Sequence, residues 1–453
     1  MTAGSVPAAG FRRLLPLDTA AAASVIGAKA ARLSTAMRAG APVLPGWVVP
    51  CAQSRPALAA AAAAVRGGDP AAARRAALSC PLDPVLREEL TAAVARLGGR
   101  VIVRSSSPLE RDPLWSGAFS SIAEVGPEDA ETAVRSCWAA AFAADPLARL
   151  DSSGLAPEAL ELALVIQPEL RPDAGGTARV NRRPDGDAEV DVEGVAGHPG
   201  ALLAGWADGV YARLRVPAAL AGQATAPARA AAPARAAAPA RAALSGGSGL
   251  AGLIGPRMAG LVAWLAARIH LLLGDNTIEW AVLNGKVFLL QSTASRVRAD
   301  NLHPGVTGTD PGAGPGMAGE DAERLAAREW MPLLAAAVRA RGHRLRGRPA
   351  AAGTAAGRLV PCRPHERPAA ACLDAILLVD HPLPALAPLL FGARGLIART
   401  GAASSHLAEV ARSLAVPMVT GCQAQSVIGD GPLRTSWLAA IDGTTGEVAL
   451  LPR

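Results

Sequence analysis

Two basic residues in the first part of the chain have surroundings that suit a phosphate group. Lys29 follows the small-residue turn Gly27-Ala28 at the opening of an amphipathic segment, and Arg104 ends a β-rich run and precedes three serines. Lysine brings a compact charge, and a helix start adds backbone N–H groups. Arginine offers a planar fork of donors. Only Lys29 and Lys286 are lysines among the 45 basic residues, so lysine is an exception in this chain.

Three further positions complete a candidate phosphate and metal site. Gly117 lies in a run of small residues that would let a loop approach phosphates closely. Glu279 and Gln291 lie on two apolar β-type runs that flank Asn284-Gly285, a strong signal for a tight hairpin. Their side-chain oxygens on adjacent strands suit magnesium that bridges phosphates.

The second part of the chain offers a nucleophile. His406 ends the run Gly401-Ala402-Ala403-Ser404-Ser405-His406. A neutral imidazole is a competent nucleophile near neutral pH, because its ordinary pKa is about 6.5. The other six histidines have no comparable context, and we interpret them as structural or solvated: His198, His270, His303, His343, His365 and His381.

Composition bounds the class of protein. The 453 residues allow about three domains at roughly 150 residues each. A hydrophobic fraction of 51%, in which alanine is the commonest residue, excludes disorder across the whole chain. The net charge of +7 comes from arginine, and no basic run is interleaved with aromatic residues, so we expect no nucleic-acid partner.

The sequence also indicates the compartment. The most apolar stretch, Met258 to Leu273, is interrupted by Arg268 and His270, and a membrane span needs about 20 apolar residues. The first 18 residues lack the basic and apolar regions of a signal peptide. Six cysteines are scattered without CxxC spacing, which argues against a zinc site or a disulfide framework. We therefore expect a cytoplasmic protein with no membrane segment.

Low-complexity segments divide the chain. Residues 226–243 are three copies of APARAA within a tether at about 222–249, and a Gly/Pro-rich stretch covers 303–319. We expect a first domain over 1–300, a linker and connecting helix over 301–346, and a compact α/β domain over 347–453. The predicted elements are strands at 100–103 and 162–166, a helix at 253–272, a hairpin of 277–283 with 286–291, strands at 375–379, 395–398 and 417–420, and a β pair at 442–450.

These motifs, in this order, resemble the phosphoenolpyruvate synthase / pyruvate phosphate dikinase family. The similarity covers both predicted domains and excludes the tether and the linker. Residues 27–49 resemble GGK…G(I)PVPPGFVV, 101–125 resemble VRSS…ED…FAGQ, 162–184 resemble VVVQ.M…SGV and 276–293 resemble DIEWA…LQ.R; 347–360 resemble G.PASPG.A.G.V, 401–421 resemble GG.TSHAAI.AR..GIP.VVG and 441–448 resemble VDG.TGEV.

The resemblance implies a fold and a reaction. The first domain would be an ATP-grasp nucleotide-binding domain, and the second a swivelling phosphohistidine α/β domain. Lys29 and Arg104 would contact ATP phosphates, while Glu279 and Gln291 would hold Mg²⁺. His406 would take a phosphoryl or pyrophosphoryl group from ATP with release of AMP, and swivelling would carry it from the nucleotide to an acceptor.

The sequence departs from the family pattern at three places. Thr293 stands where the family has arginine, for which Arg296 or Arg298 could substitute, and Thr277 stands where it has aspartate. The polar FAGQ loop has become Trp115-Ser116-Gly117-Ala118-Phe119. These changes leave a degenerate, regulatory ATP-binding protein as one alternative.

The acceptor is open at this stage. The given sequence ends after the histidine domain, without the barrel that binds pyruvate in the synthases. It also resembles rifampin phosphotransferase without that enzyme's acceptor domain. We expect a dikinase-type phosphotransferase acting on a small molecule; the alternative is a subunit of a split phosphoenolpyruvate synthase whose partner subunit binds the acceptor.

Overall fold

A computed structural model describes residues 11–183, 186–222, 248–294, 334–362, 372, 374–403, 405–429 and 436–452. The chain divides into two compact units, 1–200 with 209–294 and 201–208 with 295–453. The APARAA tether, the Gly/Pro-rich linker, Arg296 and Arg298 lie outside the described residues.

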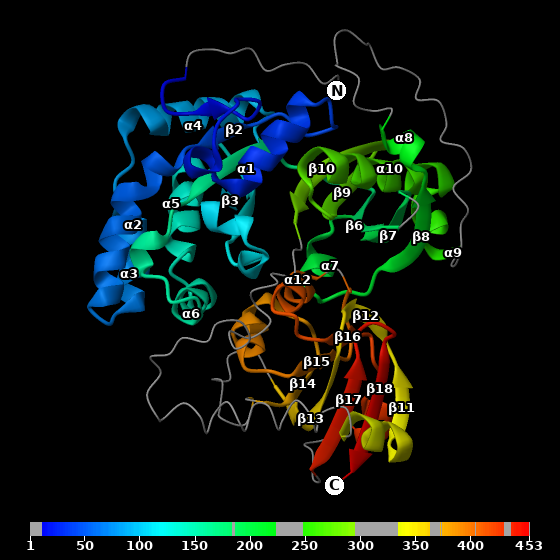
Figure 1. The fold of residues 1–453 in the computed structure, drawn as a ribbon. Coiled ribbons are helices and arrows are strands. Elements are labelled where there is room, and N and C mark those ends of the chain that lie inside the picture. Colours follow the sequence, from blue (N-terminus) through cyan, green and yellow to red (C-terminus); the bar gives the residue numbers. More distant parts are fainter. Residues whose placement is uncertain are drawn as a thin grey trace, which may run out of the picture. The chain divides into compact units, whose positions relative to one another are not determined.

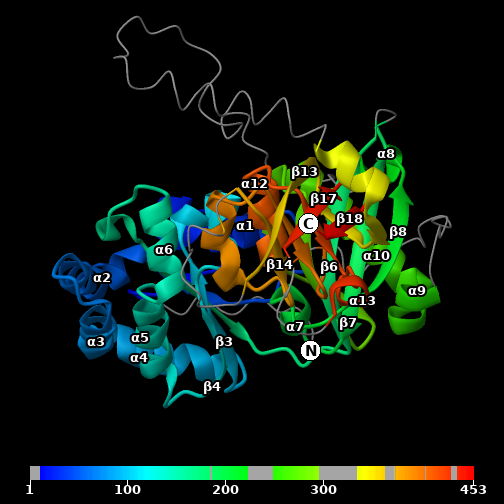
Figure 2. The ribbon, with the colours of Figure 1, turned by 90° about the horizontal axis from the view of Figure 1, so that it is seen from below.

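The first unit contains a five-stranded sheet that buries both of its faces. Alternate residues of its strands enter different cores: Trp47 and Val49 pack into one, and Val48 into the other. Figures 1 and 2 show helices gathered around this sheet. In spatial order the strands are β1 (Leu15–Pro16), β2 (Trp47–Val49), β5 (Ala163–Pro168), β3 (Val101–Ser106) and β4 (Ser121–Val125). The helices are α2 (Cys51–Arg66), α3 (Pro70–Ser79), α4 (Pro84–Arg96), α5 (Ala130–Ala140) and α6 (Ala144–Ser152), with 3₁₀ turns η1 (Pro108–Arg111), η2 (Pro113–Trp115) and η3 (Pro157–Ala159).

A second sheet of the first unit carries the predicted hairpin. The turn residues Asn284 and Gly285 have φ of 51° and 70°, the positive values that a tight hairpin turn requires. The antiparallel order is β10 (Lys286–Thr293), β9 (Thr277–Leu283), β6 (Ala174–Arg182), β7 (Ala188–Ala196) and β8 (Val210–Val216). The helices of this part are α1 (Ala23–Arg38), α8 (Ala218–Gly222), α9 (Ser248–Ile254) and α10 (Pro256–Leu273). The short helix α7 (Gly200–Leu203) lies almost wholly in the segment 201–208, which belongs to the other unit.

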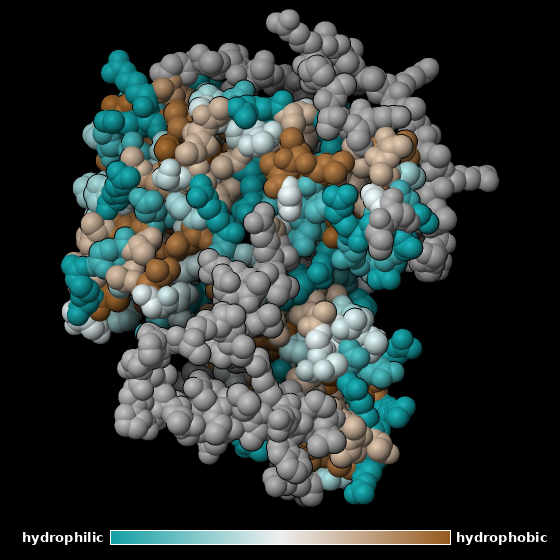
Figure 3. Space-filling model, viewed as in Figure 1, coloured by the Kyte–Doolittle hydropathy of each residue, from teal (hydrophilic) through white to brown (hydrophobic). Residues whose placement is uncertain are grey.

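Helix α10 is the apolar stretch singled out in the sequence. By length and hydropathy alone it could cross a membrane. Val262, Leu265 and Ile269 are buried in the core that the second sheet shares with α1, which is the position of a core helix. Figure 3 shows hydrophilic side chains interspersed with hydrophobic ones over the described surface of this unit.

The second unit is built on one eight-stranded sheet. Its strand order is β11 (His343–Arg346), β18 (Glu447–Pro452), β17 (Trp437–Asp442), β13 (Thr354–Pro361), β14 (Ile376–Val379), β15 (Gly395–Ala398), β16 (Met418–Thr420) and β12 (Arg348–Ala351), and its helices are η7 (Pro384–Phe391), α12 (His406–Ser413) and α13 (Gln425–Ile428). Strands β13 to β16 are parallel to one another, so their carboxyl ends lie at the same edge of the sheet. β11 and β12 form opposite ends of the sheet, although only Gly347 separates them in sequence.

The expected boundaries differ from this division in two respects. β11 and a helix at 334–341 belong to the second unit, so its described part begins before the expected residue 347. The segment 201–208, expected in the first domain, groups with the second unit. Within that unit Asp208 accepts a hydrogen bond of 3.0 Å from the Gly401 N–H, and the Trp206 ring lies 4.9 Å from that of His381. A short stretch at a domain border carries no sequence signal that shows which of the two domains it packs against.

Candidate functional site

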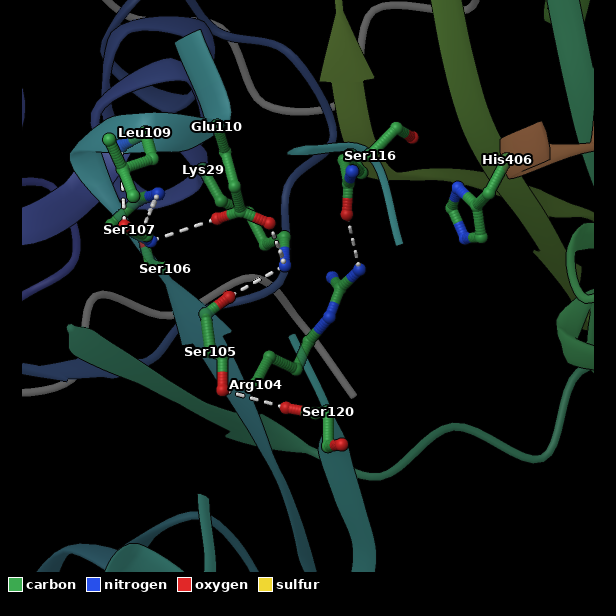
Figure 4. Close-up of polar contacts among 12 residues, drawn as sticks. Lys29, Arg104, Ser105, Ser106, Ser107, Leu109, Glu110, Ser116, Ser120 and His406 are labelled. Atoms are coloured by element: carbon green, nitrogen blue, oxygen red, sulfur yellow. Dashed lines mark hydrogen bonds and ion pairs between the residues drawn. The ribbon is translucent and has the colours of Figure 1, made fainter. Parts of the chain in front are cut away.

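Lys29 is positioned by a break in α1. Gly27 has φ 74° and ψ 165°, so the regular helical segment that carries Lys29 starts after it. The Lys29 ammonium donates to the Ser105 carbonyl oxygen at 2.6 Å and lies 3.2 Å from Glu110 Oε1 (Figure 4). Lys29 is only 6% exposed. An ammonium has three donors, and two of them are directed at these oxygens.

The start of this helical segment is joined to the end of β3. The Ala28 N–H bonds the Ser107 carbonyl oxygen at 3.0 Å, and the Ala30 N–H bonds Ser106 Oγ at 3.0 Å. A Cβ at Gly27 would lie 2.0 Å from the Ser106 carbonyl oxygen, so only glycine fits there. These N–H groups, which the sequence suggested as phosphate donors, are therefore bonded to the chain itself.

The serines after Arg104 are structural in this arrangement. Ser105, Ser106 and Ser107 are fully buried. Their hydroxyls donate to the carbonyl oxygens of Ser120, Ile26 and Glu161 respectively, at 2.7 to 2.9 Å. The sequence suggests that they face phosphates; in the structure they tie β3 to its surroundings instead.

Arg104 joins the first sheet to the hairpin of the second. Its guanidinium donates to the Leu290 carbonyl oxygen at 2.5 Å and to Gln291 Oε1 at 3.1 Å, and it lies 3.6 Å from Glu279 Oε2. Leu290 is the extra residue of an irregularity in β10, and Gln291 and Glu279 are directly opposite each other across the strands. The structure thus brings together Arg104, Glu279 and Gln291, which are 175 and 12 residues apart in sequence.

The oxygens of Glu279 and Gln291 fit a magnesium ion in part. Both residues are 9% exposed and share one face of the hairpin. Mg²⁺ is commonly held by one or two protein oxygens together with substrate phosphates and water. Among the described residues no three His, Cys, Asp or Glu side chains form a cluster, so a phosphorylated ligand would have to complete the coordination.

A buried arginine on α6 holds the loop around Gly117 in position. Arg149 on α6 donates to the carbonyl oxygens of Leu114 and Ser116 at 2.6 and 2.9 Å. Its Nε and Nη2 form two hydrogen bonds of 3.0 and 2.9 Å with the Asp145 carboxylate. Gly117 adopts φ 68°. Arg149 therefore sets the position of this loop.

A second ion pair connects α1 with the hairpin. Arg32 Nε lies 3.2 Å from Asp275 Oδ2, which also accepts a 2.7 Å hydrogen bond from Ser292. Arg32 further donates to the Glu110 carbonyl oxygen at 3.1 Å. Burial raises the pKa of Asp275, while Arg32 acts in the opposite direction. Through Arg32 and Glu110, the hairpin is tied to the Lys29 environment.

His198 lies within the electrostatic reach of this cluster. Its Nδ1 accepts a hydrogen bond from the Gly200 N–H at 3.1 Å. Burial first, and then the Arg104 charge, hold the pKa of His198 below its usual value, against Glu279 and Glu169. Both influences favour the neutral imidazole. We had interpreted His198 as structural or solvated, and its sequence context gave no other indication.

His406 begins helix α12 of the second unit. The Ser405 hydroxyl caps this helix by accepting from the Ala408 N–H at 3.4 Å. His406 Nδ1 lies 3.9 Å from the Glu409 carboxylate, and the side chain is 19% exposed. Arg412, buried on the same helix, donates to the carbonyl oxygens of Ala403 and Ala350, which fixes the loop before His406. The histidine is thus held at the positive end of a helix dipole.

Comparison with known proteins matches two segments of the chain. Residues 23–209 match the pyruvate phosphate dikinase AMP/ATP-binding domain, and residues 373–446 match the PEP-utilising enzyme mobile domain. The fold is α/β, and the chain is an ATP-binding protein of the PEP-utilising, kinase-like class. It belongs to the phosphoenolpyruvate synthase / pyruvate phosphate dikinase family.

Other comparisons add little. No curated protein matches the chain. Among solved structures, aconitase X of Thermococcus kodakaraensis in its holo form is 19% identical, covering 24% of this chain and 99% of its own, with a TM-score of 0.20. A likeness of that size carries no argument about this fold.

Several residues of the candidate site escaped sequence reasoning. Glu110 follows Ser107 by three residues, and the two form a capping box, a local signal that was available. Arg149 and Arg32 gave no such signal, because an arginine buried by tertiary contacts has the same sequence context as one on a surface.

Proposed function

We propose that the protein is an ATP-dependent phosphotransferase of the dikinase type. It cleaves ATP to AMP and passes a phosphoryl group through phosphohistidine 406 to a small-molecule acceptor. The observation that carries the proposal is the convergence of Arg104, Glu279 and Gln291 within a chain of the PEP-utilising family. We expect the reaction to take place in the cytoplasm.

The charges of the first unit support phosphate binding. Phosphoryl transfer depends mainly on positioning and on neutralising the charge of the phosphates. Lys29 and Arg104 supply two buried or nearly buried cations, each now bonded to carbonyl and carboxylate oxygens. ATP phosphates would replace part of these acceptors, so the cations need little reorientation when the nucleotide binds.

Magnesium would be held by Glu279 and Gln291. When bound, the ion would neutralise phosphate charge and orient the oxygens of the nucleotide. In our proposal Arg104 withdraws from Gln291 Oε1 toward the phosphates and leaves that oxygen to the ion. The residues that hold Arg104 at present are therefore the same ones that would accept the metal.

The environment of His406 supports its role as nucleophile. A neutral imidazole nitrogen attacks the β-phosphorus of ATP and forms an N–P bond, while the bond from that phosphorus to the α-phosphate oxygen breaks and AMP leaves. The γ-phosphoryl group of the resulting pyrophosphohistidine then passes to water and leaves as inorganic phosphate, so that phosphohistidine remains. The N-terminus of α12 favours the negative charge that the histidine then carries. Ser405 and Arg412 keep the loop and the helix in place during the step. The acceptor then attacks the phosphohistidine and regenerates the imidazole.

The proposal is tested with purified protein, Mg²⁺ and ATP labelled on the β-phosphate. We expect acid-labile label on the protein, located at His406 by peptide mapping, together with release of AMP. ATP binding without label or AMP would refute the phosphotransferase and favour a regulatory nucleotide-binding protein. If label forms, an acceptor screen with and without added pyruvate-binding subunits distinguishes a self-contained transferase from a split synthase.

A further inference from the structure

Two cysteines of the second unit lie in contact although ten residues separate them in sequence. Cys362 directly follows β13, and its N–H bonds the Leu378 carbonyl oxygen of β14 at 2.8 Å. Cys372 precedes β14. Their Sγ atoms are 3.4 Å apart. The scattered cysteine spacing in the sequence predicted no such pair.

The two cysteines differ in how exposed they are to solvent. Cys362 is 6% exposed and Cys372 is partly exposed, and neither forms a disulfide in this structure. A disulfide bond needs an S–S distance of about 2.05 Å. The two sulfurs are already in contact at 3.4 Å, so a disulfide requires them to approach each other by about 1.35 Å.

We propose that Cys362 and Cys372 are a redox modification site that forms a reversible intramolecular disulfide on exposure to a peroxide. The cross-link joins the chain leaving β13 to the chain entering β14. The carboxyl ends of β13, β14 and β15 form one edge of the sheet, and the connection from β15 to His406 starts from that edge. The modification thus acts on the unit that carries the proposed nucleophile.

The chemistry balances with the peroxide as sole oxidant. The partly exposed Cys372 thiol attacks the peroxide, the O–O bond breaks, and a sulfenic acid and one water form when hydrogen peroxide is used. The Cys362 thiol then attacks the sulfenic sulfur, the S–S bond forms, and a second water leaves. Two thiols lose two hydrogen atoms in total, and a dithiol reductant reverses the change by thiol–disulfide exchange.

The other cysteines provide an internal contrast. Burial raises the pKa of the Cys51 and Cys422 thiols to about 11 and that of Cys137 to about 12, so these thiols are almost never ionised near neutral pH. Cys80 is partly exposed like Cys372, and its Sγ lies 3.9 Å from the Pro81 carbonyl oxygen. Cys80 is therefore the matched control for oxidation of an accessible thiol outside the pair.

The test is hydrogen-peroxide titration of the full chain, read by intact mass, thiol counting and non-reducing peptide mapping. We expect loss of two hydrogen atoms, loss of two titratable thiols, a linked peptide that contains Cys362 and Cys372, and full reversal by dithiothreitol. Cys362→Ser and Cys372→Ser should each abolish the linked peptide, whereas Cys80→Ser should leave it unchanged.

Folding and competing products are controlled separately. Each variant is melted in the reduced state, and wild-type protein is melted reduced and oxidised; oxidation should raise the midpoint because the cross-link restricts the unfolded chain. The proposal is overturned if Cys372 is converted to sulfinic acid without a linked peptide at every peroxide dose. It is equally overturned if the linkage joins two molecules, seen as a dimer on a non-reducing gel.

Discussion

Thr277 and Thr293 are directly opposite each other on β9 and β10. These are the two positions at which the family pattern has an aspartate and an arginine. The two differences from the family pattern therefore affect a single cross-strand pair. Two hydroxyl side chains stand where the family pattern has two opposite charges. Glu279 and Gln291 form the next pair on the same face of the hairpin, two residues along each strand, so the change lies close to the proposed metal ligands.

This pairing predicts coupled effects on stability. Thr277→Asp alone places a carboxylate at a position that is 2% exposed, and an uncompensated buried charge costs about 3–5 kcal/mol. Thr277→Asp with Thr293→Arg should recover about 1–3 kcal/mol, measured as a double-mutant cycle by urea unfolding. Thr277→Asn with Thr293→Arg is the control without charge pairing. Additive costs in both cycles would show that the two positions do not interact.

Lys29 is expected to contribute to nucleotide affinity. Lys29→Met removes a charged donor worth about 1.5–3 kcal/mol per hydrogen bond, which corresponds to a 10- to 150-fold weaker Kd for ATP by calorimetry. It also leaves Glu110 without its ion-pair partner, so Lys29→Met with Glu110→Gln should be more stable than Lys29→Met alone. Unchanged ATP affinity in both variants would make Lys29 a structural residue only.

His406→Ala should abolish the protein-bound label while ATP affinity stays within about twofold of wild type. The imidazole is lost, but the cations and oxygens proposed to bind ATP lie elsewhere in the chain. His343→Ala, a histidine on the edge strand β11 of the same unit, should retain the label. Acid-labile phosphate on the His406→Ala protein would refute the assignment.

Arg149 is expected to act as a positioning residue for the Gly117 loop. Arg149→Met removes both loop contacts and leaves the partly buried Asp145 carboxylate without its Arg149 partner, which should lower the unfolding free energy by up to about 3 kcal/mol. Arg149→Met with Asp145→Leu removes that unpaired carboxylate and should be more stable, yet the loop stays unsupported. The KM for ATP in AMP formation should therefore remain raised in the double variant. A KM equal to wild type would limit Arg149 to a role in stability.

His198 predicts a pH dependence of nucleotide binding. Its folded-state pKa is lowered by burial and Arg104, so its contribution to stability is complete above the usual value of about 6.5 and decreases as the pH falls through that value toward the folded pKa. Bound phosphates would raise this pKa. ATP affinity of wild type relative to His198→Gln should then increase as the pH falls, up to about tenfold per unit of pKa displacement. NMR titration of His198 with and without nucleotide measures the shift directly, and an unchanged pKa would place His198 away from the phosphates.

Local patterns predicted the individual elements well. The Asn284-Gly285 turn and its flanking strands are confirmed, with β9 at the predicted residues and β10 two residues longer. β15 has the predicted bounds, and β14 and β16 begin one residue later than expected. These elements depend on turn chemistry and on short apolar runs, which are properties of neighbouring residues.

The partners of the site residues were not predictable in the same way. Glu110 beside Lys29, Arg149 beneath Ser116 and Arg32 beside Asp275 each join residues far apart in the chain. The three serines after Arg104 illustrate the limit, because residue type suggested phosphate contacts while burial commits their hydroxyls to carbonyl oxygens.

The sequence by itself determined the family, the α/β class and the residues that could take part in chemistry. Motif spacing and hydrophobic patterning depend only on the order of residues along the chain. The tertiary structure alone decided which of those residues meet: Arg104 with Glu279 and Gln291, Thr277 with Thr293, and Cys362 with Cys372. Contacts of this kind depend on strand register and on how the sheets pack, and no local pattern specifies either one.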